Sequence, residues 1–186
     1  SRDDAIGEVV YNKLWTVLNC GALRPSGKAI QRGRINILDL SGLDLLTQSV
    51  LSEVLLAMIW RRVQTEDTPR GNITLVFDEC QNLSWKKDAM IRRFLCEGRK
   101  FGLQLLLATQ TTEVFAKDVV ALLEQAATRL CFRPFQSESQ KLAKKLAQYG
   151  SANWQRILEE LVVGQSIAVG DFDINGRTIR QPLMLT

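Results

Sequence analysis

The stretch Ile73-Thr74-Leu75-Val76-Phe77-Asp78-Glu79 decides the fold class of this chain. Its first five residues all favour extended structure, which is typical of a strand buried in a sheet. Two carboxylates follow the strand at once. A second apolar run, residues 103–109, leads directly into Gln110. The interval between the two strands has room for a helix, so the sequence predicts that they lie parallel in one sheet.

The polar residues at the ends of these two strands predict a site. In open parallel sheets, ligands bind beyond the carboxyl ends of the strands. Asp78 could hold Mg²⁺ against nucleotide phosphates, and Glu79 could orient the attacking water. The amide of Gln110 could sense the γ-phosphate or hold that water. The competing interpretation, an acid pair that begins a loop and a polar strand terminus, stays open from these residues alone.

Polar breaks divide the rest of the chain into alternating helices and strands. Asp44 is placed to cap a long helix that ends near residue 64. Other helices are predicted at 4–18, 86–98, 117–127, 136–149 and 152–162, and other strands at 35–40, 129–133, 165–170 and 178–185. Asn175-Gly176 predicts a hairpin turn between the last two strands. The expected fold class is α/β, with a mainly parallel sheet flanked by helices and a C-terminal antiparallel hairpin.

A cationic turn precedes the second strand. Arg99 and Lys100 stand between Gly98 and Gly102. An arginine at a subunit boundary can neutralise charge that develops on a neighbour's nucleotide. Basic residues and a glycine also commonly end a helix, because they suit its dipole and its C-terminal geometry. Both interpretations of Arg99 stay open on local grounds.

The motifs in this order and spacing resemble the HerA/FtsK-type ring ATPases, a family of P-loop enzymes that includes TraG-like conjugative coupling proteins. The resemblance covers roughly residues 35–186. It rests on five stretches: Ile37 to Leu43, the Walker B strand Leu75 to Glu79, the turn Gly98 to Gly102, the strand that ends Ala108-Thr109-Gln110, and the closing segment Leu161 to Gly170.

The resemblance implies a partial RecA-like core and a role for each site residue. Asp78 would bind Mg²⁺, Glu79 would activate water, and Gln110 would sense the γ-phosphate of ATP. Arg99 would act as an arginine finger in trans within a homo-hexamer. The implied function is ATP hydrolysis coupled to the movement of double-stranded DNA, in a helicase-like motor that serves defence, restriction, repair or conjugation.

The phosphate-binding loop of such an enzyme is missing from the chain. That loop reads G-x-x-x-x-G-K-[ST] and stands between a strand and a helix. The nearest match, residues 22–29, has Ala22 and Ala29 at the positions of the first glycine and the hydroxyl residue. We therefore expect the P-loop in an upstream segment of the same protein, and expect the chain alone to be inactive. The absence of a start methionine fits such a fragment.

Composition narrows the function classes further. The chain has 186 residues and no histidine, which excludes histidine-based triads and histidine metal sites. Its four scattered cysteines favour a reducing, cytoplasmic setting over a disulfide scaffold. The longest apolar run, residues 54–60, is far below the roughly 20 residues that a membrane span needs. We expect a single domain, in which residues 1–34 lead into a sheet-bearing core at 35–186.

Basic residues supply a second hypothesis for function. The net charge is +4, which mildly favours a polyanionic partner. The candidates for phosphate contacts with DNA are Lys86, Lys87, Arg92, Arg93, Lys141, Lys144 and Lys145. On this hypothesis the chain is a non-catalytic DNA-binding or scaffold module on a degenerate ATPase fold. A metal nuclease that uses Asp39 with the acid pair is a third possibility, but no further acid cluster is placed to complete a two-metal site.

Overall fold

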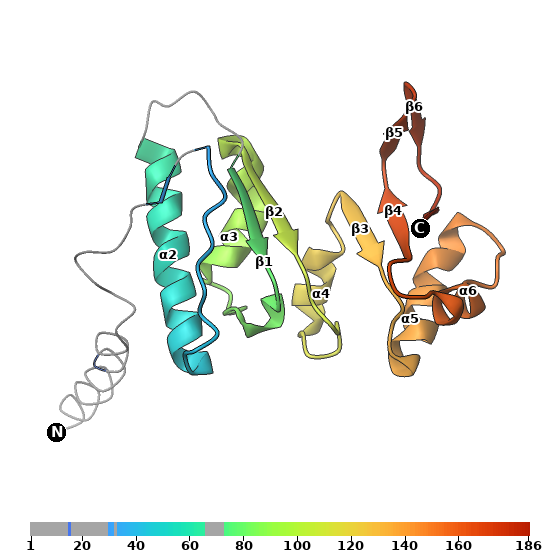
Figure 1. Cartoon of the computed structure of the whole chain (residues 1–186), viewed down its shortest axis with the longest axis horizontal. Helices are drawn as coiled ribbons and strands as arrows, with labels where there is room; N and C mark the ends of the chain where they lie inside the picture. Colours follow the sequence, from blue (N-terminus) through green and yellow to red (C-terminus); the bar gives the residue numbers. More distant parts are fainter. Residues whose placement is uncertain (1–14, 16–29, 32, 66–72) are drawn as a thin grey trace. The chain divides into compact units, whose positions relative to one another are not determined.

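The computed structural model describes residues 15, 30–31, 33–65 and 73–186. The predicted helix at 4–18, apart from Trp15, and the P-loop-like stretch at 22–29 lie outside these residues. The chain divides into two compact units, residues 1–108 and 109–186, and each is described by itself (Figure 1). The fold is mixed α/β, with a small parallel sheet in the first unit and antiparallel sheets in the second.

In its described residues, the first unit has two helices, two strands and two short 3-10 turns. Its elements are α2 (Leu45–Thr65), β1 (Ile73–Phe77), η1 (Cys80–Asn82), α3 (Met90–Glu97), η2 (Gly98–Phe101) and β2 (Leu103–Leu107). The predicted cap of α2 is confirmed, since the backbone N–H of Thr47 donates to Asp44 Oδ1 at 3.0 Å. The Thr47 hydroxyl donates to Asp44 Oδ2, so this carboxylate satisfies the start of the helix.

The parallel pairing of the two apolar strands is confirmed. β1 and β2 pair in register from Ile73 opposite Leu103 to Phe77 opposite Leu107. Alternate side chains of both strands pack against α2 and α3 in one core, whose buried members are Leu56, Trp60, Ala89, Ile91, Phe94 and Leu103. The other face of the sheet exposes Val76 and Leu106, so the described part of the first unit covers one face only.

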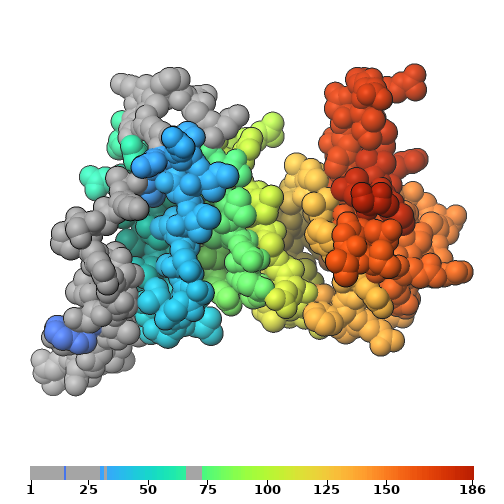
Figure 2. Space-filling model, in the orientation of Figure 1, coloured from blue at the N-terminus to red at the C-terminus, as the bar shows by residue number. Residues whose placement is uncertain are grey.

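The strand predicted at residues 35–40 is wrong. This segment has no regular structure, and Ile35 is 93% exposed. Figure 2 shows it, in blue, on the surface of the molecule. Polar side chains hold it in local turns instead: Asn36 bonds to both backbone groups of Gln31, and Asp39 accepts from Ser41. A strand needs a neighbour to pair with, and the described residues supply none here.

The second unit packs two helices against an antiparallel sheet. Its elements are α4 (Lys117–Leu123), β3 (Thr128–Cys131), α5 (Gln136–Leu146), η3 (Ala147–Tyr149), α6 (Trp154–Glu160), β4 (Ser166–Gly170), β5 (Phe172–Ile174), β6 (Arg177–Ile179) and β7 (Leu183–Leu185). The strand order β3-β4-β7 is antiparallel throughout. The expectation of a mainly parallel sheet is therefore wrong, because parallel pairing is confined to β1 and β2 in the described chain.

The hairpin turn at Asn175-Gly176 is confirmed, but four short strands take the place of the two predicted at 165–170 and 178–185: β4 pairs with β7, and β5 pairs with β6. β5 and β6 pair around Asn175 and Gly176, which both have positive φ, at 54° and 75°. Two positive φ values in succession are the signature of a type I′ turn, which Asn-Gly favours. The Gly176 N–H also donates to Asp173 Oδ1 at 2.9 Å. Among the described helices, none combines the length and apolarity that a bilayer crossing requires.

Candidate functional site: the carboxyl edge of β1 and β2

Backbone hydrogen bonds continue past the ends of the two parallel strands. The Ala108 N–H donates to the Phe77 carbonyl at 2.9 Å, and the Cys80 N–H donates to the Ala108 carbonyl at 2.9 Å. Asp78 and Glu79 lie between these two bonds in the chain. The acid pair is therefore fixed at the carboxyl edge of β1, directly beside the end of β2.

Glu79 has a strained backbone at this edge. Its φ of 52° and ψ of 49° place it in the left-handed helical region, where the side chain of an L-residue crowds the following carbonyl and costs about 1–2 kcal/mol. Asn175 of the hairpin is the only other non-glycine residue of positive φ in the described chain. Asparagine tolerates that region, whereas glutamate has no such preference. Strain of this kind concentrates at functional sites.

Hydrogen bonds within the same segment hold both carboxylates in place. Asp78 is exposed, and its Oδ1 accepts the Glu79 N–H at 3.0 Å. Gln81 donates from Nε2 to Glu79 Oε2. The backbone then turns through η1, where Trp85 Nε1 donates to the Cys80 carbonyl at 2.9 Å. Asp78 to Gln81, which we call the rim, are thus part of an ordered turn.

Thiol chemistry is absent from this rim. Cys80 is 1% exposed, and burial raises the pKa of its thiol to about 11. Such a thiol stays protonated at neutral pH and is a poor nucleophile. Cys80 therefore serves the packing beneath the turn.

Gln110 is the second residue of the second unit. It is exposed and follows Leu107, the last residue of β2, by three positions, so a fully extended chain would span at most about 11 Å between them. The neighbouring Thr109 hydroxyl donates to the Thr111 carbonyl at 2.8 Å, which closes a tight turn directly after the strand. Gln110 therefore lies in the loop that follows β2.

Arg99 lies at the opposite edge of the sheet. It belongs to η2, which precedes β2, and the Ile73 N–H donates to the carbonyl of Gly102 at 3.1 Å. Five strand residues separate this amino edge from the acid pair, which corresponds to about 16 Å. Arg99 is exposed and is not placed to reach the acid pair of its own chain.

Most of the basic candidates for DNA contact already have partners within their own unit. Lys86 and Lys87 lie in a turn, because α3 begins only at Met90, so their predicted helical placement is wrong. Four of the other candidates have partners. Arg92 donates a hydrogen bond to the Trp85 carbonyl, and Arg93 pairs with Glu97 and lies over the Trp60 ring. Lys141 pairs with Glu113, and Lys145 pairs with Glu124. Lys144 is exposed on α5. The DNA-binding hypothesis gains little from this arrangement.

Two carboxylates with structural roles were not predicted from the sequence. Glu53 of α2 accepts the Met90 N–H at 3.0 Å and so caps α3 from a different helix. Glu138, 6% exposed, accepts three hydrogen bonds from Thr111 and Thr112. The place of Glu138 in the first turn of α5 was the only signal, and an acid there is usually explained by the helix dipole. Both contacts join segments that are distant in the sequence.

Comparison with protein-family models finds no match for this chain. A search of curated proteins likewise finds no match. The described residues contain no group of three or more histidine, cysteine or acidic side chains that could hold a metal ion.

Proposed function

We propose that this chain is the metal-and-water half of an ATPase core of the HerA/FtsK type, a RecA-like domain in which ATP hydrolysis drives double-stranded DNA through a homo-hexamer. A P-loop from an upstream segment of the same protein completes the site. The observation that carries the proposal is the carboxyl edge of β1 and β2, where Asp78 and a strained Glu79 stand beside the end of the neighbouring parallel strand.

The residues at this edge fit the requirements of a Mg-ATP site. Mg²⁺ in phosphoryl-transfer enzymes is usually held by one or two carboxylates, by the nucleotide phosphates and by water. One exposed carboxylate, Asp78, meets the protein's share of that need. Glu79 then orients and polarises the attacking water, and the Gln110 amide contacts the γ-phosphate or that water.

The position of Arg99 supports an arginine finger that acts on a neighbouring subunit. A finger must reach the γ-phosphate, and Arg99 lies about 16 Å from the acid pair of its own chain. In a ring, the amino edge of one sheet can face the nucleotide of the next subunit. An exposed arginine at that edge, between Gly98 and Gly102, is free of the site that its own chain builds.

Turnover in the full-length protein tests the proposal. We expect the isolated chain to bind Mg-ATP too weakly for calorimetry to detect at micromolar concentration, because the phosphate cradle is absent. The full-length protein should hydrolyse ATP, and Glu79→Gln should lower kcat by about 10²–10⁴-fold. Glu97→Gln is the matched control, since Glu97 pairs with exposed Arg93 in α3.

Two results would contradict the proposal. One is micromolar Mg-ATP binding by the isolated chain. The other is full turnover in Glu79→Gln. Salt-sensitive DNA binding by the isolated chain that survives Asp78→Ala would instead favour the non-catalytic DNA-binding module.

A further inference from the structure

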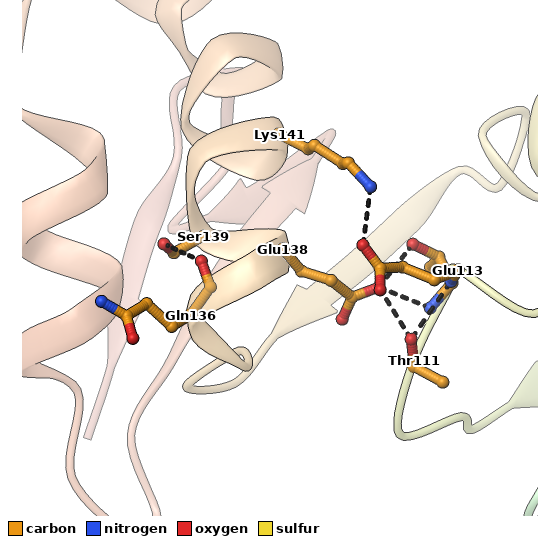
Figure 3. A network of polar contacts seen from close by, with 7 residues as sticks. Thr111, Glu113, Gln136, Glu138, Ser139 and Lys141 are labelled. Atoms are coloured by element: carbon orange, nitrogen blue, oxygen red, sulfur yellow. Dashed lines mark hydrogen bonds and ion pairs between the residues drawn. The ribbon is translucent and has the colours of Figure 1, made fainter.

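The loop that follows Gln110 is held by a single buried carboxylate of α5. Glu138 Oε1 accepts from the Thr112 N–H at 2.7 Å, from the Thr112 hydroxyl at 2.8 Å and from the Thr111 hydroxyl at 3.1 Å. Figure 3 shows Glu138 extending from the first turn of α5 toward this loop. All of these residues belong to the second unit.

A second contact from the same helix secures the next residue of the loop. Lys141, one turn after Glu138, donates from Nζ to Glu113 Oε1 at 2.6 Å, as Figure 3 shows. This bond raises the pKa of Lys141, with a smaller contribution from the charge of Glu138. Within the loop, the Glu113 N–H donates to the Thr111 hydroxyl at 3.1 Å. Three successive residues after Gln110 are therefore attached to α5.

The chemistry of Glu138 indicates that its position matters. A carboxylate that is 6% exposed pays a large desolvation cost unless hydrogen bonds replace its water. Here the replacements are three donors from one loop and the favourable end of the α5 dipole. An apolar residue would fill the space without that cost. What glutamate alone supplies is a fixed acceptor for Thr111 and Thr112.

We propose that Glu138 is a positioning residue that sets the loop 111–113 and thereby the approach of Gln110 to the nucleotide. Because Glu138 and Lys141 both belong to α5, movement of this helix would shift the loop directly after the sensing amide. The second unit thus couples α5 to the chemical step. This inference rests on the proposed ATPase function and deepens it.

Amide exchange and turnover test the inference together. In this chain, Glu138→Ala should speed hydrogen exchange at the Thr112 amide by about tenfold or more, since a bond to a charged acceptor is lost. In the full-length protein the same substitution should lower kcat about tenfold and leave KM for ATP within about threefold, because misplacement affects the reacting geometry more than binding. Glu138→Gln keeps an oxygen acceptor and should restore both values.

The matched control is Glu159→Ala. Glu159 of α6 accepts from Ser139 of α5 at 2.9 Å, so its loss perturbs α5 without touching the loop. It should leave Thr112 exchange and kcat within about twofold. If Glu138→Ala fails to fold, Thr111→Val with Thr112→Val removes the two hydroxyl donors and keeps Glu138 in place. This pair should also lower kcat.

Each failure has its own signature. If hydrogen exchange at the Thr112 amide is unchanged in Glu138→Ala, the claim that Glu138 holds the loop 111–113 is wrong. If Thr112 exchange is faster in Glu138→Ala but kcat is unchanged, the loop is not coupled to the chemical step, and the ATPase proposal still stands. A Glu138→Gln variant that protects Thr112 yet turns over as slowly as Glu138→Ala also overturns the coupling. Full-length protein without ATPase activity overturns the inference together with the proposed function.

Discussion

Replacing Glu79 by glycine should separate stability from activity at the rim. Its left-handed backbone, with φ 52° and ψ 49°, costs a residue with a Cβ about 1–2 kcal/mol, and glycine adopts it freely. Glycine also loses about 0.5–1 kcal/mol more backbone entropy than alanine on folding. Glu79→Gly should therefore be more stable than Glu79→Ala by about 0.5–1 kcal/mol. Both variants lose the carboxylate, so its contact with Gln81 cancels in this comparison.

A second pair of variants isolates the strain from the entropy. Asp88 is exposed and is not among the residues of positive φ, so only the entropy term acts there. Asp88→Gly should be less stable than Asp88→Ala by about 0.5–1 kcal/mol. The contrast between the two positions should then be about 1–2 kcal/mol, which is the strain itself.

The assay is urea unfolding followed by tryptophan fluorescence. A Trp154→Phe background removes the tryptophan of the second unit, and Trp15, Trp60 and Trp85 then report on the first. In the full-length protein both Glu79 variants should be inactive, although Glu79→Gly is the more stable. Glycine that destabilises position 79 as much as position 88 would refute the claim that the rim stores strain.

Three further predictions concern the rest of the molecule. Gly170→Ala should destabilise the second unit by more than about 2 kcal/mol in urea unfolding, because a Cβ there would lie 2.5 Å from the Ala127 carbonyl oxygen at a φ of 157°. Asp44→Ala should lower the midpoint of urea unfolding, because it removes the side chain that caps α2. The bond from the Thr47 side chain lowers the pKa of Asp44. The stability that the Asp44 carboxylate contributes is therefore complete above about pH 4 and is lost as pH falls through its folded pKa. Below about pH 4, unfolding of Asp44→Ala should depend less on pH than unfolding of the wild-type chain. If the proposed hexamer forms, Arg99→Ala subunits mixed with wild-type subunits should reduce ATPase activity more steeply than their fraction, whereas a strictly proportional decline would contradict action in trans.

The elements that the sequence predicted well are those whose cause is local. The acid after an apolar strand, the cap at Asp44 and the turn at Asn175-Gly176 each depend on residues within a few positions of one another. The segment at 35–40 is also rich in apolar residues, yet it forms no strand. Composition can favour an extended chain, but its backbone bonds must come from a neighbouring strand that the composition does not specify.

The rim shows the same division between local and distant causes. Asp78 and Glu79 could be placed from the strand that precedes them, because parallel strands carry ligands at their carboxyl ends. The left-handed conformation of Glu79 could not be predicted, since glutamate is not a residue that signals positive φ. Glu138 could not be found either, because its partners lie 26 and 27 positions away in the chain. Long-range polar contacts leave no spacing pattern to detect.

Under the proposed function, one upstream segment would explain both the exposed face of the described sheet and the need for a phosphate-binding loop. Parallel sheets are normally covered on both faces, yet β1 and β2 form a two-stranded sheet that leaves Val76 64% and Leu106 54% exposed. A P-loop brings a strand before it and a helix after it. An upstream segment of that kind would extend the sheet, cover apolar surface and supply the phosphate cradle at once. One upstream segment would therefore meet two separate requirements of the proposed function, a cover for the exposed face of the described sheet and a cradle for the phosphates.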